Sequence, residues 1–185
     1  DVKVTATPYP IETTVSSSYG FNIRSGAAAN NFKSTNGNAI VFIKNASTNL
    51  TDVTAQITQA GSGTTGFVTT GGAFVRTQKV FQVSPAAANT TATYQATFYF
   101  TEAELAAWGS GKLTLKIIKV KDGIDLSSTL NAGNAELINP GVFEDAAAGY
   151  ITYTGNFPGF SQFMLVSPAT AFPVTFHNFA ATPHK

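Results

Sequence analysis

The segment from Thr91 to Val120 most constrains the fold of this chain, because its residue pattern changes period twice. From Ala92 to Phe100 every second residue is apolar, which predicts a strand with one buried face. Thr101 and Glu104 then have the spacing of a capping box, in which a hydroxyl and a carboxylate satisfy the first backbone N–H groups of a helix. The pattern therefore predicts a strand that leads directly into a helix.

This helix is predicted to be short. Phe100 and Leu105 have the spacing of a hydrophobic staple across its first turn. Glycines follow Trp108 at positions 109 and 111, and glycine is the favoured residue just after a helix. We therefore expect a helix near residues 102–108, followed by a strand from Leu113 to Val120.

Short alternating or apolar runs recur along the rest of the chain, separated by turn residues. The predicted strands are Val2–Thr7, Thr13–Ile23, Ile40–Ile43, Val53–Ile57, Phe67–Thr70, Ala73–Val83, Tyr150–Thr154, Phe160–Val166 and Val174–Phe179, with further short strands in 124–148. Gly26–Asn38 is predicted to be a loop that ends in an Asn36-Gly37 turn, and Gly155–Gly159 is predicted to be a turn.

About ten short strands at close spacing, with one short helix, are typical of an all-β antiparallel β-sandwich, either jelly-roll or Ig-like. The length of 185 residues fits one sandwich domain that spans residues 1–185.

The composition excludes several classes of partner. Only 11% of residues are charged and the net charge is +1, which gives no electrostatic basis for binding nucleic acid or an anionic membrane. The chain has no cysteine and no apolar run long enough for a transmembrane helix. A hydroxyl-rich and amide-rich chain of this kind is typical of a secreted β protein.

Three stretches resemble a known group of proteins. These are residues 153–165, which include Gly159-Phe160-Ser161, together with Phe172-Pro173-Val174, and the Phe98–Leu105 segment. They resemble β-sandwich modules of secreted and cell-surface proteins of Bacteroidota that precede a type IX secretion sorting domain. The resemblance implies an extracellular β-sandwich, with Phe172 where leucine is usual. It implies no activity, because such proteins include adhesins, proteases and polysaccharide-degrading enzymes.

The sequence contains no convincing catalytic, cofactor-binding or metal-binding motif. The glycines at 61, 63 and 66 match a dinucleotide-binding pattern, but a strand rather than a helix is predicted after them. His177 and His184 are too isolated for a triad or a zinc site. A glycosidase needs two carboxylates in a cleft, and the ten acidic residues offer few that turns and the helix start do not explain. Asp122 and Asp125 are weak calcium candidates, because hard cations take oxygen ligands from loops.

Carbohydrate binding is the other interpretation, since sugar rings stack on exposed aromatic faces. Trp108 is the main candidate, because it lies next to a glycine-rich loop, and Tyr150 and Tyr153 are secondary ones. The competing interpretation is that Trp108 packs on the core.

We therefore predict a non-catalytic, extracellular structural or adhesive module of a bacterial surface that assembles with copies of itself or with neighbouring surface domains. The apolar segments Val2–Thr7 and Ala171–Ala181 favour contacts by strand addition. The alternative is a carbohydrate-binding module of a secreted polysaccharide-degrading protein, with polysaccharide as its partner. A third hypothesis is a hydrolase, which would need a cleft with a pair of carboxylates.

Overall fold

The computed structural model describes residues 10–168 of the chain. Within them the chain forms fourteen strands and one 3₁₀ helix, η1 (Ala103–Thr114). The strands pair antiparallel in two sheets, so the predicted all-β antiparallel sandwich is confirmed, although it has more strands than expected. The predicted strands at Val2–Thr7 and Val174–Phe179, and both histidines, lie outside the described residues.

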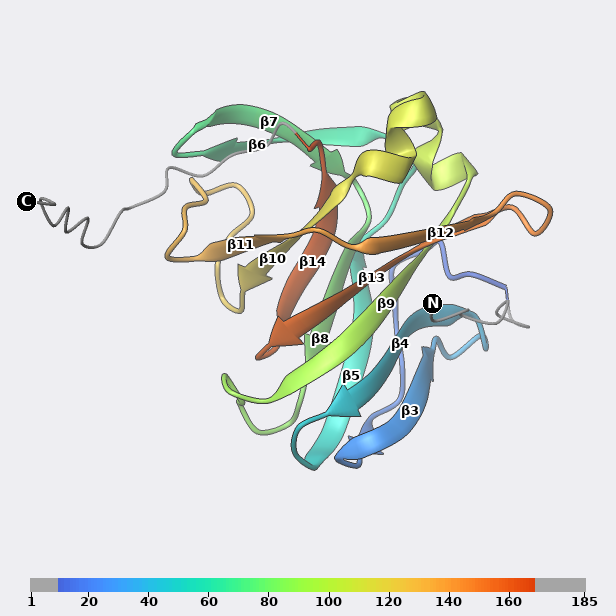
Figure 1. The fold of residues 1–185 in the computed structure, drawn as a ribbon, viewed down its shortest axis with the longest axis vertical. Coiled ribbons are helices and arrows are strands. Elements are labelled where there is room, and N and C mark those ends of the chain that lie inside the picture. The colour runs from blue at the N-terminus through green and yellow to red at the C-terminus, as the bar shows by residue number, and fades with distance from the viewer. Residues whose placement is uncertain (1–9, 169–185) are drawn as a thin grey trace, which may run out of the picture.

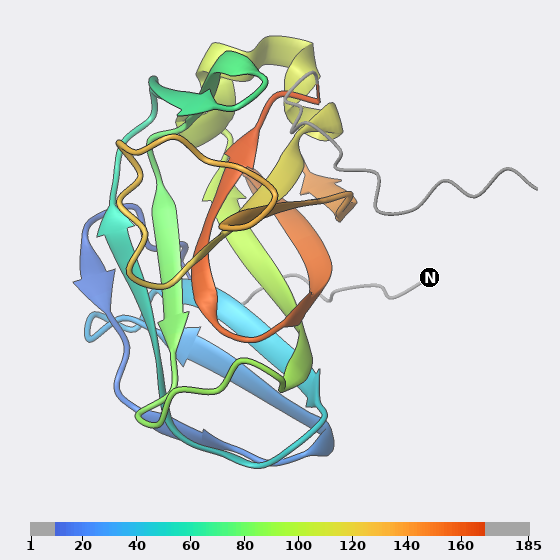
Figure 2. The same ribbon diagram turned by 90° about the vertical axis from the view of Figure 1, so that its left-hand side faces the viewer.

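The first sheet has five strands in the order β12–β13–β9–β4–β3. They are β3 (Gly26–Lys33), β4 (Ala39–Ala46), β9 (Thr93–Thr101), β12 (Gly141–Asp145) and β13 (Tyr150–Pro158). The second sheet has nine strands, with β1–β5–β8–β14–β10–β11 as its main path. They are β1 (Ser16–Ser17), β2 (Phe21–Ile23), β5 (Leu50–Gln59), β6 (Thr64–Thr69), β7 (Gly72–Thr77), β8 (Val80–Ser84), β10 (Lys116–Lys121), β11 (Ala135–Ile138) and β14 (Ser161–Val166). Both views place η1 at one end of the molecule and β3 at the other (Figures 1 and 2).

The core between the sheets is built on aromatic rings. The ring of Phe98 on β9 lies 5.0 Å from Phe81 on β8 and 4.8 Å from Phe163 on β14, measured between centroids. Burying one such ring contributes about 2 to 3 kcal/mol. The buried face predicted for this strand is confirmed, although Thr97 and Tyr99 on the other face are buried as well. The residues of the predicted face are Ala92, Tyr94, Ala96, Phe98 and Phe100.

The nine-stranded sheet is buried on both faces around β10 and β14. Ile117 belongs to the core between the sheets, whereas Ile118 belongs to a second cluster that includes Phe67 of the β6–β7 hairpin and Leu130. A strand that is buried on both sides carries apolar residues at successive positions, which explains the adjacent Ile117 and Ile118.

The predicted end of the helix after Trp108 is confirmed by a break at Gly109, but the sequence did not indicate the second run of 3₁₀ turns that follows. Gly109 takes a non-helical conformation (φ 52°, ψ −134°), and the chain then forms further 3₁₀ turns up to Thr114. Lys112 holds these turns in place, because its ammonium pairs with Glu102 and Glu144. The following strand consequently begins at Lys116 rather than at Leu113.

The predicted loop at Gly26–Asn38 is also wrong, since residues 26–33 form strand β3. Alanine, asparagine and glycine have low strand propensity, but pairing with the buried strand β4 and burial of Phe32 outweigh it. The Asn36-Gly37 turn itself is confirmed, because Gly37 has φ 84° and its N–H donates to the carbonyl of Ser34.

The predicted turn at Gly155–Gly159 is wrong for all but its last residue. Strand β13 continues to Pro158, and only Gly159 adopts a positive φ, of 65°. A Cβ at Gly155 would lie 2.6 Å from the ring of Phe157. Position 155 therefore requires glycine because the ring of Phe157 packs directly against it within the strand.

Candidate functional site

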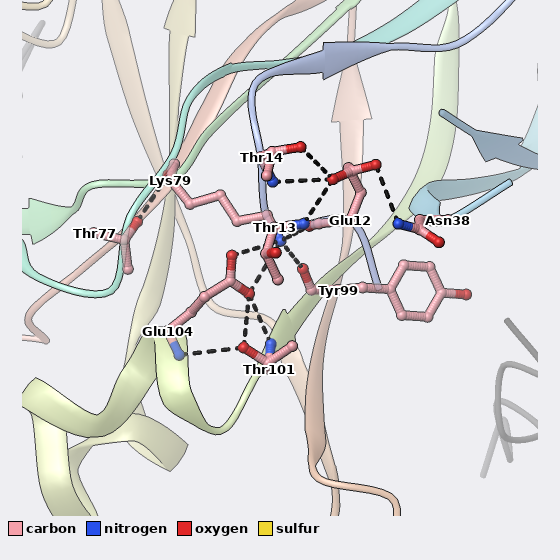
Figure 3. A network of polar contacts seen from close by, with 9 residues as sticks. All are labelled: Glu12, Thr13, Thr14, Asn38, Thr77, Lys79, Tyr99, Thr101 and Glu104. Carbon is pink, nitrogen blue, oxygen red and sulfur yellow. Dashed lines mark hydrogen bonds and ion pairs between the residues drawn. The ribbon is translucent and has the colours of Figure 1, made fainter. Parts of the chain in front are cut away.

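A fully buried lysine forms the most heavily bonded polar cluster of the described chain (Figure 3). The Nζ atom of Lys79 donates to the carbonyl oxygens of Glu12 at 2.6 Å and Tyr99 at 3.0 Å. It also lies 3.0 and 3.1 Å from the two carboxylate oxygens of Glu104. Burial lowers the pKa of Lys79, and the negative charge of Glu104 opposes that shift.

The same glutamate closes the predicted capping box. The N–H of Thr101 donates to Oε2 of Glu104 at 2.8 Å, and the N–H of Glu104 donates to Oγ1 of Thr101 at 3.2 Å. The capping box is thus confirmed, but its carboxylate also neutralises Lys79, which sequence reasoning missed. A lysine next to the apolar Val80-Phe81 run was the available signal. Because Lys79 is enclosed on all sides, we interpret the cluster as a structural tie.

Glu12 supplies a second carboxylate, which faces the β3–β4 turn. It accepts the N–H groups of Thr13 and Thr14, each at 3.0 Å, and the amide of Asn38 at 3.3 Å (Figure 3). Burial alone would raise the pKa of Glu12, but hydrogen bonds from Ser34, Thr14 and Thr13 outweigh it and lower the pKa to about 2. The charged form of Glu12 therefore braces this turn.

The aromatic residues predicted for ligand binding do not form a platform. Tyr150 is 3% exposed and Tyr153 is fully buried, with its hydroxyl donating to the carbonyl of Lys112. These two predictions are corrected, because a buried ring offers no face to a sugar. Trp108 is partly buried and packs against the core, as its competing interpretation predicted.

The calcium candidates do not converge. The carboxylate of Asp125 accepts the N–H of Ser127 at 2.8 Å in its own turn. Burial raises the pKa of Asp122, and the positive charge of Lys119 acts in the opposite direction. An ammonium group beside Asp122 disfavours a cation there. Within residues 10–168, no group of three or more His, Cys, Asp and Glu side chains has the arrangement of a metal site.

The Gly159-Phe160-Ser161 stretch, which carried the family resemblance, has a structural explanation. A Cβ on Gly159 would lie 3.0 Å from the carbonyl oxygen of Thr90, so only glycine fits this turn. The ring of Phe160 stacks on Tyr94 at 4.7 Å, and the hydroxyl of Tyr94 donates to the carbonyl of Gly159. Ser161 is buried in β14, as an ordinary strand residue would be.

The two outer strands of the five-stranded sheet differ in chemistry. Strand β12 ends in Glu144 and Asp145, and Nζ of Lys112 lies 2.8 Å from Glu144. Strand β3 carries no charge from Gly26 to Phe32, and β4 is its only sheet neighbour among the strands of residues 10–168. Nδ2 of Asn30 and Oδ1 of Asn31 are buried without a hydrogen-bond partner in the described chain. Strand β3 is thus the uncharged edge, contacted near its end by Phe21, which packs on Phe32, and by Ser18, which bridges to Ser34. We treat it as the candidate interface.

Comparison with known proteins gives no assignment: no family model, no curated protein and no solved structure matches this chain. Among the described residues, no helix is long and apolar enough to cross a membrane.

Proposed function

We propose that this chain is a non-catalytic structural or adhesive module of a bacterial cell surface, which acts outside the cell by associating with further copies of itself. The observation that carries the proposal is the β3 edge, which is eight residues long and uncharged up to Lys33. Natural proteins usually block such edges with charges, prolines or a covering segment. Strand β3 has no charge or proline up to Lys33, which suits it to strand addition, although two register shifts interrupt its pairing with β4.

A second copy of the chain is the partner that fits this edge. Two β3 strands that meet antiparallel would place the same surface on both sides of a twofold axis, which is how most symmetric dimers form.

The roles of the acidic side chains support a non-catalytic function. Most carboxylates of the described chain accept hydrogen bonds or ion pairs that hold the fold, namely those of Glu12, Glu102, Glu104, Asp125, Glu144 and Asp145. The likeness to surface modules of Bacteroidota supports the placement outside the cell, where a type IX sorting domain would direct such a module.

Sedimentation velocity and negative-stain microscopy of the full chain over a range of concentrations test the proposal. The decisive variant is Ala29→Glu with Asn31→Glu, which charges the β3 edge. It is expected to fold, because Ala29 is exposed and lies opposite Lys44, an opposite charge across the strand pair.

We expect the wild-type chain to associate and the charged variant to remain monomeric. The matched control, Thr51→Glu with Gln59→Glu, adds the same charge at exposed positions of β5 and should associate as the wild type does. A wild-type chain that stays monomeric up to about 1 mM, equivalent to less than about 4 kcal/mol of association, would overturn the proposal.

A further inference from the structure

A groove of about 550 Å³ lies over the β12–β13 pair, beside the point where the chain passes from β11 into β12. Its lining includes Gln95 of β9 and Thr152, Thr154 and Asn156 of β13. These four residues share the face of the β9–β13 pair that points away from the core, because Phe98 and Phe157 occupy the alternate positions. The groove is therefore built on regular strands.

The polar groups of the groove are not all used within the protein. Nε2 of Gln95 donates to Oδ1 of Asn156 at 3.2 Å, which leaves Oε1 of Gln95 buried and without a partner in the described chain. The hydroxyl of Thr152 is also buried without a partner in the described chain, and the residue as a whole is only 1% exposed. Unpartnered polar groups of this kind cost free energy, which a bound polar molecule would recover.

The shape of the groove comes from a glycine and an aromatic ring. Gly141 lies directly opposite Thr154, and a Cβ there would have only the carbonyl of Thr154 nearby, at 4.0 Å. Phe143, two residues along the same strand, is 38% exposed and lies opposite Thr152. The missing side chain leaves a hollow in which a ring of Phe143 forms one wall.

We infer that this groove binds a neutral saccharide. No charged side chain of the described chain lines it, so an anionic or cationic ligand would lose hydration without gaining an opposite charge. Amides and hydroxyls that both donate and accept match the hydroxyl groups of a sugar. The exposed ring of Phe143 can cover the apolar C–H face of a pyranose. The volume lies within the range of small-molecule sites.

This site is separate from the β3 edge, since β12 and β3 are the opposite outer strands of the sheet. It also differs from the predicted aromatic site, which relied on Trp108, Tyr150 and Tyr153. Failure of saccharide binding and failure of self-association are therefore independent results.

The test is titration calorimetry of the full chain with neutral hexasaccharides of glucose, xylose, mannose and N-acetylglucosamine, backed by amide chemical-shift mapping. At least one hexasaccharide should bind and shift amides around Gln95, Thr154 and Asn156. Gly141→Val fills the hollow at a position with room for the side chain and should abolish binding. Gln95→Ala removes one hydrogen-bonding group and should weaken binding about five- to tenfold.

The matched control is Gln56→Ala, a half-exposed glutamine of β5 outside the groove, which should bind as the wild type does. If Gly141→Val fails to fold, the Gln95→Ala result decides. Absence of binding to all four hexasaccharides overturns the inference. Binding that neither groove variant changes, or shifts that centre elsewhere, overturns it as well.

Discussion

Strands β12 and β3 are the two outer strands of the same sheet, but they differ in the charge that they carry. Strand β12 is short and carries two carboxylates, of which Glu144 pairs with Lys112 of η1. Strand β3 is longer and uncharged along most of its length. One outer strand of this sheet thus carries charges that oppose strand pairing, whereas the other does not.

The two edges are nonetheless braced through one buried residue. Lys79 binds the carbonyl of Glu12, whose carboxylate holds the β3–β4 turn through Asn38. Lys79 also binds Glu104 in η1, the helix that contributes Lys112 to β12. Substitution of Lys79 should therefore affect both edges, whereas substitution of Glu12 or Glu144 should affect one edge each.

The largest effect is expected from substitution of Lys79. Lys79→Met leaves the carboxylate of Glu104 buried without its cation, which should lower the free energy of unfolding by about 3 to 5 kcal/mol. Urea denaturation measures the loss. The double variant Lys79→Met with Glu104→Gln removes the charge but keeps an acceptor for Thr101, so it should recover most of the stability. A single variant that loses less than about 1 kcal/mol would contradict the role of this tie.

A smaller effect, confined to the β3 side, is expected from Glu12→Gln. Loss of hydrogen bonds to a charged acceptor should cost about 2 kcal/mol at neutral pH. Because the folded pKa of Glu12 is about 2, below its ordinary value of 4.5, the contribution is present above pH 4.5 and is lost as the pH falls towards 2.

Wild type and Glu12→Gln should therefore converge in stability near pH 2, and hydrogen exchange should rise in β3 before it rises in β12. The matched control is Glu136→Gln, at an exposed position of β11, which should change stability by no more than about 0.5 kcal/mol. Equal acceleration of exchange at both edges would show that Glu12 does not act locally.

The third prediction converts β12 into an edge like β3. Glu144→Gln with Asp145→Asn removes both charges and keeps the acceptor that Asp145 offers to the N–H of Ala148. On the background of Ala29→Glu with Asn31→Glu, this change should restore association, which sedimentation velocity detects. Continued monomeric behaviour would show that charge is not what protects β12.

The smallest effect is expected from Lys112→Met. The ion pairs of Lys112 with Glu102 and Glu144 are partly exposed, so their removal should lower the melting temperature only slightly. Salt at about 1 M screens such pairs, so the difference from the wild type should shrink there. A difference that persists in high salt would point to packing of the lysine stem instead.

The sequence predicted best those features that depend on neighbouring residues. The predicted buried face of β9 and the spacing of Thr101 and Glu104 are local, and both are present in the structure. Strand β3 was missed because an edge strand of alanine and asparagine is specified by its partner β4 and not by its own propensity. Gly155 was misread because the ring that requires a glycine there is apparent only once β13 is built.

The candidate sites were harder to predict for the same reason. The groove joins residues from 95 to 156, and the register that places Gly141 opposite Thr154 depends on the whole sheet. Tyr150 and Tyr153 lie on opposite faces of β13, and both are buried. Alternation along the strand does not predict burial on both faces. Exposure of an aromatic residue depends on what the rest of the chain places over it.

The Lys79 cluster is also expected to influence how fast the folded chain unfolds. The ammonium of Lys79 contacts Glu12, which lies 67 positions away in the sequence, and Glu104, which lies 25 positions away. Contacts that close such long loops form after local hairpins, because the chain entropy must be lost first. A late contact leaves the folding rate almost unchanged and acts mainly by slowing unfolding. Loss of the Lys79 contacts is therefore expected to shorten the lifetime of the folded chain and to leave its folding rate nearly unchanged.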